Sequence, residues 1–258
     1  MEYSGSVFVL GTSSAFAEKD RFFSSYLIIS GNQSILFDCG DGISTAFAKY
    51  DINSASIDGI LISHLHSDHY CGLPSLLTRM KIENRSQLLK IFCYEEDISY
   101  LKGFLSNSYI FLDRLGFDVH FEGFYNGHII SVQPGFTILP FENTHLDKYK
   151  DYNTGGEYSL NSSSFVFELK SKFICLSGDI GSINDLQFSS QFKDCTVISE
   201  ISHVKIDEIL DFVTKNKLEN CYLSHYENRV REAVSASGIL DNFSNVRFLS
   251  EGEEIILR

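Results

Sequence analysis

Residues 59–74 read GILISHLHSDHYCGLP, an apolar run that leads into four metal-ligand side chains within six positions. Alternate side chains of an extended segment share a face, so we expect His64 and His66 to point together and a turn to direct Asp68 and His69 to a second point. Imidazole and carboxylate groups are zinc-type ligands, and zinc sites that do chemistry keep an open position for water. The chain has only eight histidines, so three within six residues indicate a metal site rather than a solvated turn.

Three further ligand-type residues follow apolar runs elsewhere in the chain. They are His145 after TILPFENT, Asp179 in FICLSGD and His225 in CYLSH. Each of them alone is more often an ordinary loop residue. Because four ligands in one loop cannot complete two metal sites, the three together favour a site shared between several loops.

The histidine cluster is expected on a loop between a strand and a helix. A helix is expected at residues 73–80, where Pro74 suits the first turn, and another at 43–50. The GNQ sequence between two of the expected strands predicts a hairpin. Short runs rich in Val, Ile, Leu and Phe and bounded by turn residues predict strands at 6–11, 25–30, 34–40 and 58–63.

The second half of the chain repeats this alternation. The apolar spacing at residues 204–217 predicts a helix, and a second helix is expected at 230–240. No linker divides the halves, so we expect one domain over residues 1–258, of α/β (layered α+β) class, with two mixed sheets packed on each other and helices outside. Further strands are expected at 90–96, 119–125, 136–145, 164–179, 195–202, 220–229 and 246–258.

Composition limits the function. With 258 residues and 43% hydrophobic side chains, the chain can bury a full core, and the absence of a membrane-length apolar run or a signal-peptide pattern predicts a cytoplasmic protein. Six dispersed cysteines suit buried thiols in a reducing compartment, although Cys39 and Cys71 lie beside the motif loops. The net charge of -13, without a dense basic run, disfavours polyanionic partners unless metal ions attract them.

HLHSDH is similar to the HxHxDH signature of the metallo-β-lactamase superfamily, and the chain resembles the branch that contains ribonuclease Z and related phosphodiesterases. VLGTSSAF, SSYLIIS, LFDCGDG, NTH, LSGD and LSHYENR follow in the family's order over nearly the whole chain. The resemblance implies a four-layer αββα sandwich with a metal site at one edge, between the two sheets.

The resemblance also implies roles for the ligands. Asp38 in LFDCGDG matches a buried aspartate that orients the metal loop without binding metal, although a turn-capping carboxylate is the alternative. Two divalent ions are implied, with Zn²⁺ favoured and Mn²⁺ or iron as alternatives. The implied ligands are His64, His66 and His145 for one ion, Asp68, His69 and His225 for the other, and Asp179 as the bridge between them.

The candidate catalytic residues are Asp68, Glu200 and Arg229. Two metals about 3.5–4 Å apart can generate hydroxide from a shared water near neutral pH. Arg229 follows His225 at the distance where ribonuclease Z has a phosphate-binding arginine, although a surface arginine is the alternative. Glu200 falls at a His–Glu pair linked to proton transfer, but Ser199 replaces the histidine. His120, His128 and His203 fit no ligand pattern, although His203 stands apart from the other two because it closely follows Glu200.

The substrate expectation depends on departures from ribonuclease Z. The segment between His145 and Asp179 is short and lacks the Gly- and Pro-rich arm that grips transfer RNA. We therefore expect a phosphodiesterase acting on a small anionic phosphodiester such as a cyclic nucleotide, with no membrane partner. The sequence leaves the oligomeric state open, with a homodimer as one candidate because ribonuclease Z relatives often pair. The alternatives are tRNA 3′ processing, thioester or lactone hydrolysis, an iron-dependent oxidoreductase, and a non-catalytic binding protein, which the complete ligand set disfavours.

Overall fold

The computed structural model describes residues 4–257, which divide into two compact units. We call Gly5–Tyr125 together with Glu251–Leu257 the N-terminal unit, and Asn126–Ser250 the C-terminal unit. Each unit contains a seven-stranded mixed sheet. A single domain over residues 1–258 remains a prediction.

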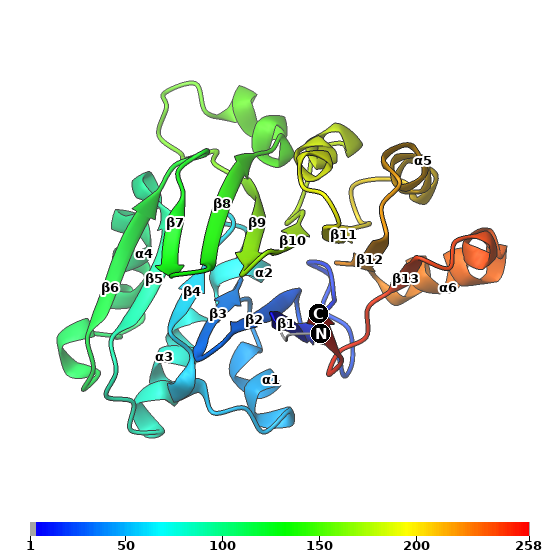
Figure 1. The fold of residues 1–258 in the computed structure, drawn as a ribbon. Coiled ribbons are helices and arrows are strands. Elements are labelled where there is room, and N and C mark those ends of the chain that lie inside the picture. Colours follow the sequence, from blue (N-terminus) through cyan, green and yellow to red (C-terminus); the bar gives the residue numbers. More distant parts are fainter. Residues whose placement is uncertain (1–3, 258) are drawn as a thin grey trace. The chain divides into compact units, whose positions relative to one another are not determined.

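The sheet of the N-terminal unit has the strand order β14-β1-β2-β3-β4-β5-β6 (Figure 1). The pairs from β14 to β3 are antiparallel and those from β3 to β6 are parallel. Gly31, with a φ of +59°, lies in the turn between β2 and β3, where Ser30 pairs with Gln33. This confirms the predicted hairpin. The strands are β1 (Gly5–Gly11), β2 (Ser25–Ser30), β3 (Gln33–Phe37), β4 (Gly59–Leu61), β5 (Leu89–Tyr94), β6 (Val119–Phe124) and β14 (Glu254–Leu257).

Helices of the N-terminal unit cover its sheet and form a core with it. Phe47, Leu77 and Leu105, from three different helices, belong to the same buried cluster as Leu36 and Ile91 of the sheet. Burial of each such side chain contributes about 1.5–3 kcal/mol. The helices are α1 (Ile43–Lys49), α2 (Ser67–Tyr70), α3 (Leu73–Ile82) and α4 (Ile98–Asn107), with 3₁₀ turns at Ser54–Ser56, Glu95–Asp97 and Leu112–Arg114.

The sheet of the C-terminal unit has the order β13-β12-β11-β10-β9-β8-β7. The pairs from β13 to β10 are parallel, and those from β10 to β7 are antiparallel. Because β8 and β10 are both antiparallel to β9, the strands β8, β10, β11 and β12 all end at the same edge of this sheet. The strands are β7 (Ile130–Gln133), β8 (Phe136–Glu142), β9 (Ser163–Leu169), β10 (Lys172–Leu176), β11 (Thr196–Glu200), β12 (Asn220–Ser224) and β13 (Val246–Phe248).

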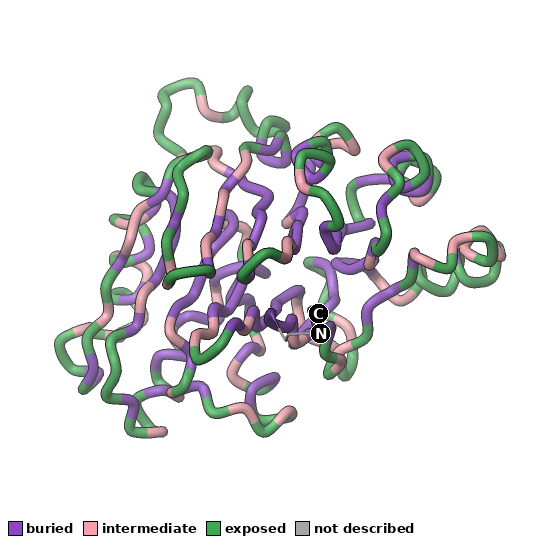
Figure 2. The backbone as a smooth tube through the Cα atoms, in the orientation of Figure 1, coloured by how far each residue is buried: buried purple, intermediate pink, exposed green. Residues whose placement is uncertain are grey.

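Helix α5 (Ile206–Asn216) packs on this second sheet through the apolar face that its sequence predicts. Ile209 and Val213 share a buried cluster with Val197 and Leu223 of the sheet. In Figure 2 the strands of both units are largely buried, whereas the helices turn an exposed side to solvent. The remaining helical segments are α6 (Asn228–Ser237) and the 3₁₀ segments His145–Tyr152, Ile183–Gln191 and Ile239–Asn242.

The structure differs from the sequence-based expectation in several places. Helix α4 and strand β7 are not among the expected elements, and residues 67–70, expected within a loop, form helix α2. The segment 246–258, expected as one strand, contains two: β13 pairs with β12, and β14 pairs with β1 after a turn at Gly252, whose φ is +84°. The other expected strands and helices are present within residues 4–257, with ends that differ by a few residues.

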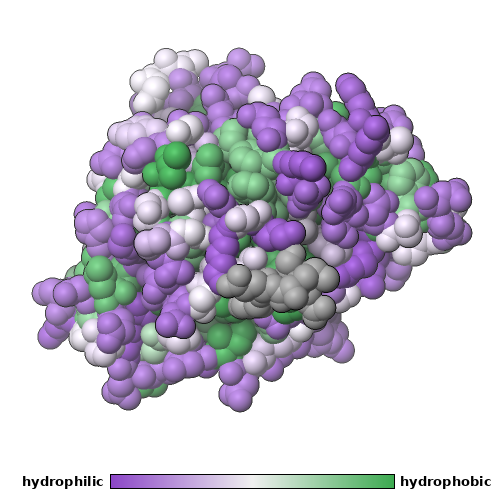
Figure 3. All heavy atoms as spheres, viewed as in Figure 1, coloured by the Kyte–Doolittle hydropathy of each residue, from purple (hydrophilic) through white to green (hydrophobic). Residues whose placement is uncertain are grey.

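The surface and the cysteines have the character that the composition predicts, a polar exterior and free thiols that are mostly buried. The face shown in Figure 3 is mostly hydrophilic, with small apolar areas between the polar ones. All six cysteines are free thiols, and five of them are buried. Within residues 4–257, no helix has the length and apolar character needed to cross a bilayer.

Candidate metal centre

Asp38 fixes the loop that carries HLHSDH. It directly follows β3, has a φ of +58° and is 1% exposed. Its Oδ1 accepts a hydrogen bond from the Ser63 N–H (2.8 Å), and its Oδ2 lies 2.9 Å from the Ser63 hydroxyl and 2.6 Å from His69 Nδ1. Burial raises the pKa of Asp38, while the charge and hydrogen bond of His69 oppose this increase. Asp38 therefore contacts both ends of the ligand loop.

Two glycines allow the ligand loop to pack closely against its neighbours. The Cys39 N–H donates to the His69 carbonyl (2.7 Å), and the Gly72 N–H donates to the Cys39 carbonyl (2.8 Å). A Cβ atom on Gly40 would lie 2.0 Å from the Asp68 carbonyl oxygen, and one on Gly72 would lie 2.1 Å from the Gly40 carbonyl oxygen. Any larger residue at either position would displace the main chain of the loop.

The four ligand-type side chains of this loop lie close together. His64 Nε2 is 3.0 Å from His66 Nδ1, and the His64 and His69 ring centroids are 4.1 Å apart. Asp68 Oδ2 lies 3.3 Å from His69 Nε2. Because Asp38 binds Nδ1 of His69, the ring presents Nε2 as its ligand atom, which is the usual orientation of a metal-binding histidine. The sequence-predicted cluster is thus formed within the N-terminal unit.

The C-terminal unit brings together the three ligand-type residues that follow its strands. His145 lies beyond β8, Asp179 beyond β10 and His225 directly after β12. His145 Nε2 is 3.6 Å from Asp179 Oδ2, and His225 Nε2 is 3.3 Å from Asp179 Oδ1. All three are buried, and His225 has a φ of +49°, which few non-glycine residues adopt. The shared strand edge thus places one carboxylate between two imidazoles.

Asp185, which the sequence reasoning missed, ties two of these ligand segments together. Its Oδ2 accepts hydrogen bonds from the Thr144 N–H (3.1 Å) and hydroxyl (2.8 Å), and from the Gly181 N–H (2.8 Å). Thr144 precedes His145, and Gly181 lies two residues after Asp179. One carboxylate therefore fixes the spacing of both segments.

Glu200 ends β11 as a buried carboxylate with several partners. Its Oε1 accepts from the Ile180 N–H (3.2 Å), and its Oε2 accepts from the N–H groups of Ser202 (2.6 Å) and His203 (2.9 Å). Oε1 also lies 3.0 Å from His203 Nδ1. These contacts favour an orienting role for Glu200 over delivery of a proton to a leaving group.

His203, which the sequence reasoning left without a role, lies among the ligands of the C-terminal unit. Its ring centroid is 4.7 Å from that of His145 and 6.1 Å from that of His225. The hydrogen bond to Glu200 raises the pKa of His203, and burial opposes this change.

Two short sequence patterns could have identified these missed residues. Glu200 and His203 are three positions apart, and SIND at 182–185 is the capping-box pattern that contains Asp185.

Arg229 lies on helix α6 and faces solvent. Its side chain is 80% exposed, with Nε 2.5 Å from Glu227 Oε2 and an N–H group 3.0 Å from Glu227 Oε1. The guanidinium group thus pairs with a neighbouring carboxylate. His120 and His128 are exposed, as expected for residues outside the ligand pattern.

The donor sets fit divalent metal ions. The N-terminal loop offers three imidazoles and one carboxylate, and the C-terminal cluster offers imidazoles beside a carboxylate, which are ligands that zinc accepts. Burial raises the pKa of the Cys39 and Cys71 thiols, which disfavours the thiolate forms that bind metal. The histidines and aspartates are therefore the candidate metal ligands.

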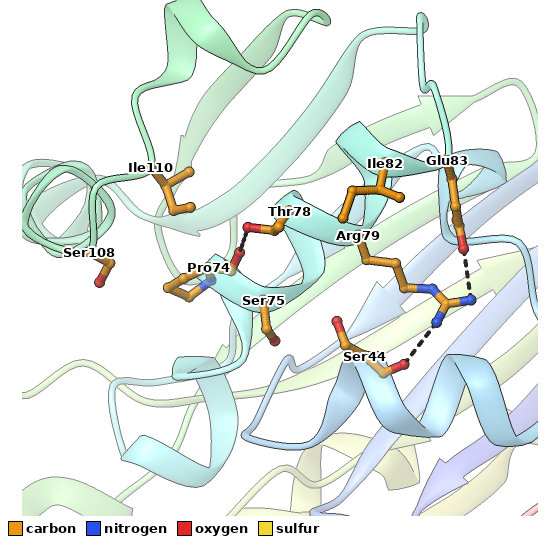
Figure 4. Close-up of a pocket in the computed structure, with 9 residues that line it drawn as sticks. All are labelled: Ser44, Pro74, Ser75, Thr78, Arg79, Ile82, Glu83, Ser108 and Ile110. Carbon is orange, nitrogen blue, oxygen red and sulfur yellow. Dashed lines mark hydrogen bonds and ion pairs between the residues drawn. The ribbon is translucent and has the colours of Figure 1, made fainter.

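A pocket of about 610 Å³ lies elsewhere in the N-terminal unit, along helix α3 (Figure 4). Ile82 and Ile110 line it, and Arg79 beside it pairs with Glu83 (2.7 Å) and donates to the Ser44 carbonyl (3.2 Å). None of the predicted metal ligands lines this pocket.

Curated relatives include both a phage protein and ribonucleases. The chain is 26% identical to the anti-Pycsar protein Apyc1 of Bacillus phage BSP38 over 273 aligned positions, which cover 100% of both chains. It is 28% identical to ribonuclease Z of Archaeoglobus fulgidus (55% of this chain, 45% of the relative) and 35% identical to that of Methanococcus maripaludis (61% and 47%). The matches thus span about half the length of the ribonuclease Z relatives. Ribonuclease Z is a nuclease by name, which agrees with the predicted class of hydrolase.

Solved structures show the fold. The metallo-β-lactamase fold protein YhfI of Bacillus subtilis matches with a TM-score of 0.74 at 18% identity, over 98% of this chain and 99% of the other. The short form of human tRNase Z matches with a TM-score of 0.72 at 19% identity, over 97% and 98%. The chain therefore has the metallo-β-lactamase fold, and the predicted class, two mixed sheets flanked by helices, is confirmed. The family model that matches residues 6–252 is that of the anti-Pycsar protein Apyc1, and the chain belongs to this family.

Proposed function

We propose that this protein is a two-metal phosphodiesterase that hydrolyses a small phosphodiester, with cyclic nucleotides as the leading substrate class. The observation that carries the proposal is the set of imidazole and carboxylate ligands, all buried except His66, with Asp38 supporting the set in one unit and Asp185 in the other. The name of the matching family supports a cyclic nucleotide as substrate.

The resemblance assigns the seven ligand-type side chains to two divalent ions. When bound, such a pair of ions activates water for attack on phosphorus and stabilises the charge that grows on the phosphoryl oxygens. Zn²⁺ is the leading metal, with Mn²⁺ and iron as alternatives. The proposed ligands are His64, His66 and His145 for one ion and Asp68, His69 and His225 for the other, with Asp179 between them.

The chain's own residues prepare this site before a metal binds. Asp38 holds His69 by its Nδ1 and anchors the start of the same loop through Ser63. Asp185 fixes the segments that contain His145 and Asp179. Positioned ligands reduce the conformational entropy that metal binding would otherwise cost.

The charge of the chain supports a small substrate. A net charge of -13 repels long phosphate backbones, whereas divalent ions at the site would attract a single phosphodiester. Processing of tRNA is the second candidate function, because ribonuclease Z relatives match up to 64% of this chain. Homodimerisation also remains a prediction, which light scattering on the full chain would check.

Replacement of His66 by alanine tests the metal-dependent hydrolysis. We expect the unmodified chain to bind two ions and to hydrolyse a cyclic nucleotide, and the His66→Ala variant to lose at least one ion and most of the activity. His128→Ala is the matched control, because His128 is exposed and outside the predicted ligand pattern. Unchanged hydrolysis by folded His66→Ala would disprove the proposed metal-dependent mechanism.

A substrate panel separates the proposed function from its alternatives. It contains 3′,5′-cyclic nucleotides, a generic aryl phosphodiester, a tRNA precursor, a thioester and a lactone. We expect the highest kcat/KM for a cyclic nucleotide. Faster cleavage of the tRNA precursor would favour the second candidate, and turnover of only the thioester or lactone would reject both.

A further inference from the structure

His203 is positioned as a ligand although it lies outside the seven proposed ligand positions. Asp179, His203 and His225 each offer a ligand atom, and these atoms lie within 4.8 Å of one another. The His203 side chain is 32% exposed, so that solvent and ions can reach it. All three residues belong to the C-terminal unit.

Glu200 fixes which nitrogen of His203 is free. Its Oε1 lies 3.0 Å from His203 Nδ1, and its Oε2 accepts the His203 main-chain N–H (2.9 Å). A carboxylate oxygen at Nδ1 accepts a hydrogen bond from Nδ1–H, so the neutral ring carries its lone pair on Nε2, which is available to a metal. Metal-binding histidines typically use this arrangement, with one ring nitrogen donating to a carboxylate and the other binding the metal.

The hydrogen bond orients His203 rather than satisfying Glu200. The N–H groups of Ile180, Ser202 and His203 already donate to this carboxylate, which is 1% exposed. The contact with the imidazole ring therefore adds a fixed ring direction to a carboxylate that is already satisfied. The same arrangement occurs in the N-terminal unit, where Asp38 holds Nδ1 of His69.

We propose that His203 is a further metal ligand, which joins Asp179 and His225 in binding one of the two proposed ions. Two imidazoles and one carboxylate are a common ligand set of catalytic zinc, which then keeps an open position for water. The inference rests on the proposed metal centre and adds a ligand to it. It also explains why Glu200 is buried beside the cluster without a free oxygen for proton transfer.

Metal affinity tests this inference directly. Full-length protein without metal is titrated with Co²⁺, the visible absorption of the bound ion is recorded, and affinity is measured by competition with a chelator. For Glu200→Gln we expect one ion to bind about 10–100-fold more weakly, as is usual when a supporting hydrogen bond is lost. For His203→Ala we expect a larger loss and a changed Co²⁺ spectrum, because a ligand itself is removed. His128→Ala is expected to leave both unchanged.

Two further measurements exclude an indirect effect. The circular dichroism and Tm of each metal-free variant show whether it is folded, and His203→Gln is a second variant that keeps a polar side chain of similar length. Added imidazole is expected to restore part of the Co²⁺ spectrum in His203→Ala.

The outcomes separate this inference from the proposed function. If the unmodified chain binds two ions and the folded His203 variants bind them with the same affinity and spectrum, the His203 inference is wrong and the two-metal proposal stands. If the unmodified chain binds no stoichiometric metal, both are wrong. Loss of one ion in the His203 variants, with the other ion retained, supports the inference.

Discussion

The ligand loop of the N-terminal unit and the ligand cluster of the C-terminal unit differ in how the chain brings their side chains together. The loop takes four ligand-type residues from positions 64–69, so that local chain geometry places them. The cluster takes His145, Asp179 and His225 from three separate segments, which meet because their strands end at one edge of the sheet. The loop therefore depends on local packing, whereas the cluster depends on the topology of a whole sheet.

The two regions also share a device. In each, a buried carboxylate binds Nδ1 of a histidine: Asp38 binds His69 at 2.6 Å, and Glu200 lies 3.0 Å from His203. In each, a non-glycine residue of the site has a positive φ, +58° for Asp38 and +49° for His225. Such conformations cost roughly 1–3 kcal/mol and persist only where the surrounding structure imposes them. The comparison predicts that close packing contributes most to stability in the loop. It also predicts that hydrogen-bonded carboxylates support metal binding in both regions.

The largest effect is expected for Gly40→Ala in the ligand loop. The new methyl group would lie 2.0 Å from the Asp68 carbonyl oxygen, which is main chain and cannot move alone. We expect the free energy of unfolding to fall by about 3 kcal/mol, at the upper end of typical overpacking costs. Urea denaturation of the metal-free protein measures this change. Gly103→Ala is the control: a Cβ there meets nothing within 4 Å, so it is expected to stabilise helix α4 by about 0.5–1 kcal/mol. A Gly40→Ala variant as stable as the unmodified protein would contradict the role of close packing.

The second effect concerns the carboxylate of the loop. Asp38→Asn leaves the shape of the side chain but replaces one acceptor with an N–H₂ group, which cannot satisfy both Ser63 and His69. We expect metal affinity to fall by about 100-fold, the upper end for loss of a supporting partner. Asp58→Asn is the control in the same unit, because Asp58 accepts the Ser34 N–H (2.7 Å) at the opposite end of β4. An equal loss of metal affinity in both variants would show that general destabilisation causes it.

A smaller effect is expected for Asp185→Asn in the cluster. The variant weakens the link between Thr144 and Gly181, but Asn keeps one oxygen that can still accept some of the hydrogen bonds. We expect metal affinity to fall by about tenfold, the lower end for loss of a supporting partner. Asp211→Asn, an exposed position on α5, serves as the control. A loss larger than that of Asp38→Asn would reverse the ranking of the two regions.

The sequence predicts much of the fold because its signals are local. Alternating short apolar runs identify most strands, and the spacing of Ile206, Ile209 and Val213 identifies helix α5. Helix α4 is missed because its buried residues Leu101 and Leu105 lie in a segment with several aromatic and polar residues and no cap signal. The division of residues 246–258 is also missed, since pairing partners far apart in sequence decide it.

For the candidate site, the sequence predicts the ligand-type residues but not most of the residues that support them. HLHSDH is recognisable because its four ligand types lie within six positions. The strand-end residues are recognisable only as a set, because each alone is more often an ordinary loop residue. The residues that support the ligands are harder to find. Asp185 binds Thr144, and His203 lies beside His145 and His225, all of which are distant in sequence. These contacts exist only once β8, β10, β11 and β12 are aligned at one edge of the sheet.

The smallest effect is expected for Arg229→Ala, which tests how far the C-terminal cluster extends along the chain. Arg229 lies four residues after His225, yet its side chain is 80% exposed and pairs with Glu227. Exposed ion pairs contribute about 0–1 kcal/mol, so we expect almost no change in the free energy of unfolding and none in metal affinity. If the pair with Glu227 persists during turnover, kcat/KM on a cyclic nucleotide falls by less than about tenfold, which is about 1.4 kcal/mol. Glu227→Gln, which releases the guanidinium group, is the matched variant. A hundredfold fall for Arg229→Ala, together with a gain for Glu227→Gln, would instead show that Arg229 reaches the phosphate and that the functional cluster includes the start of helix α6.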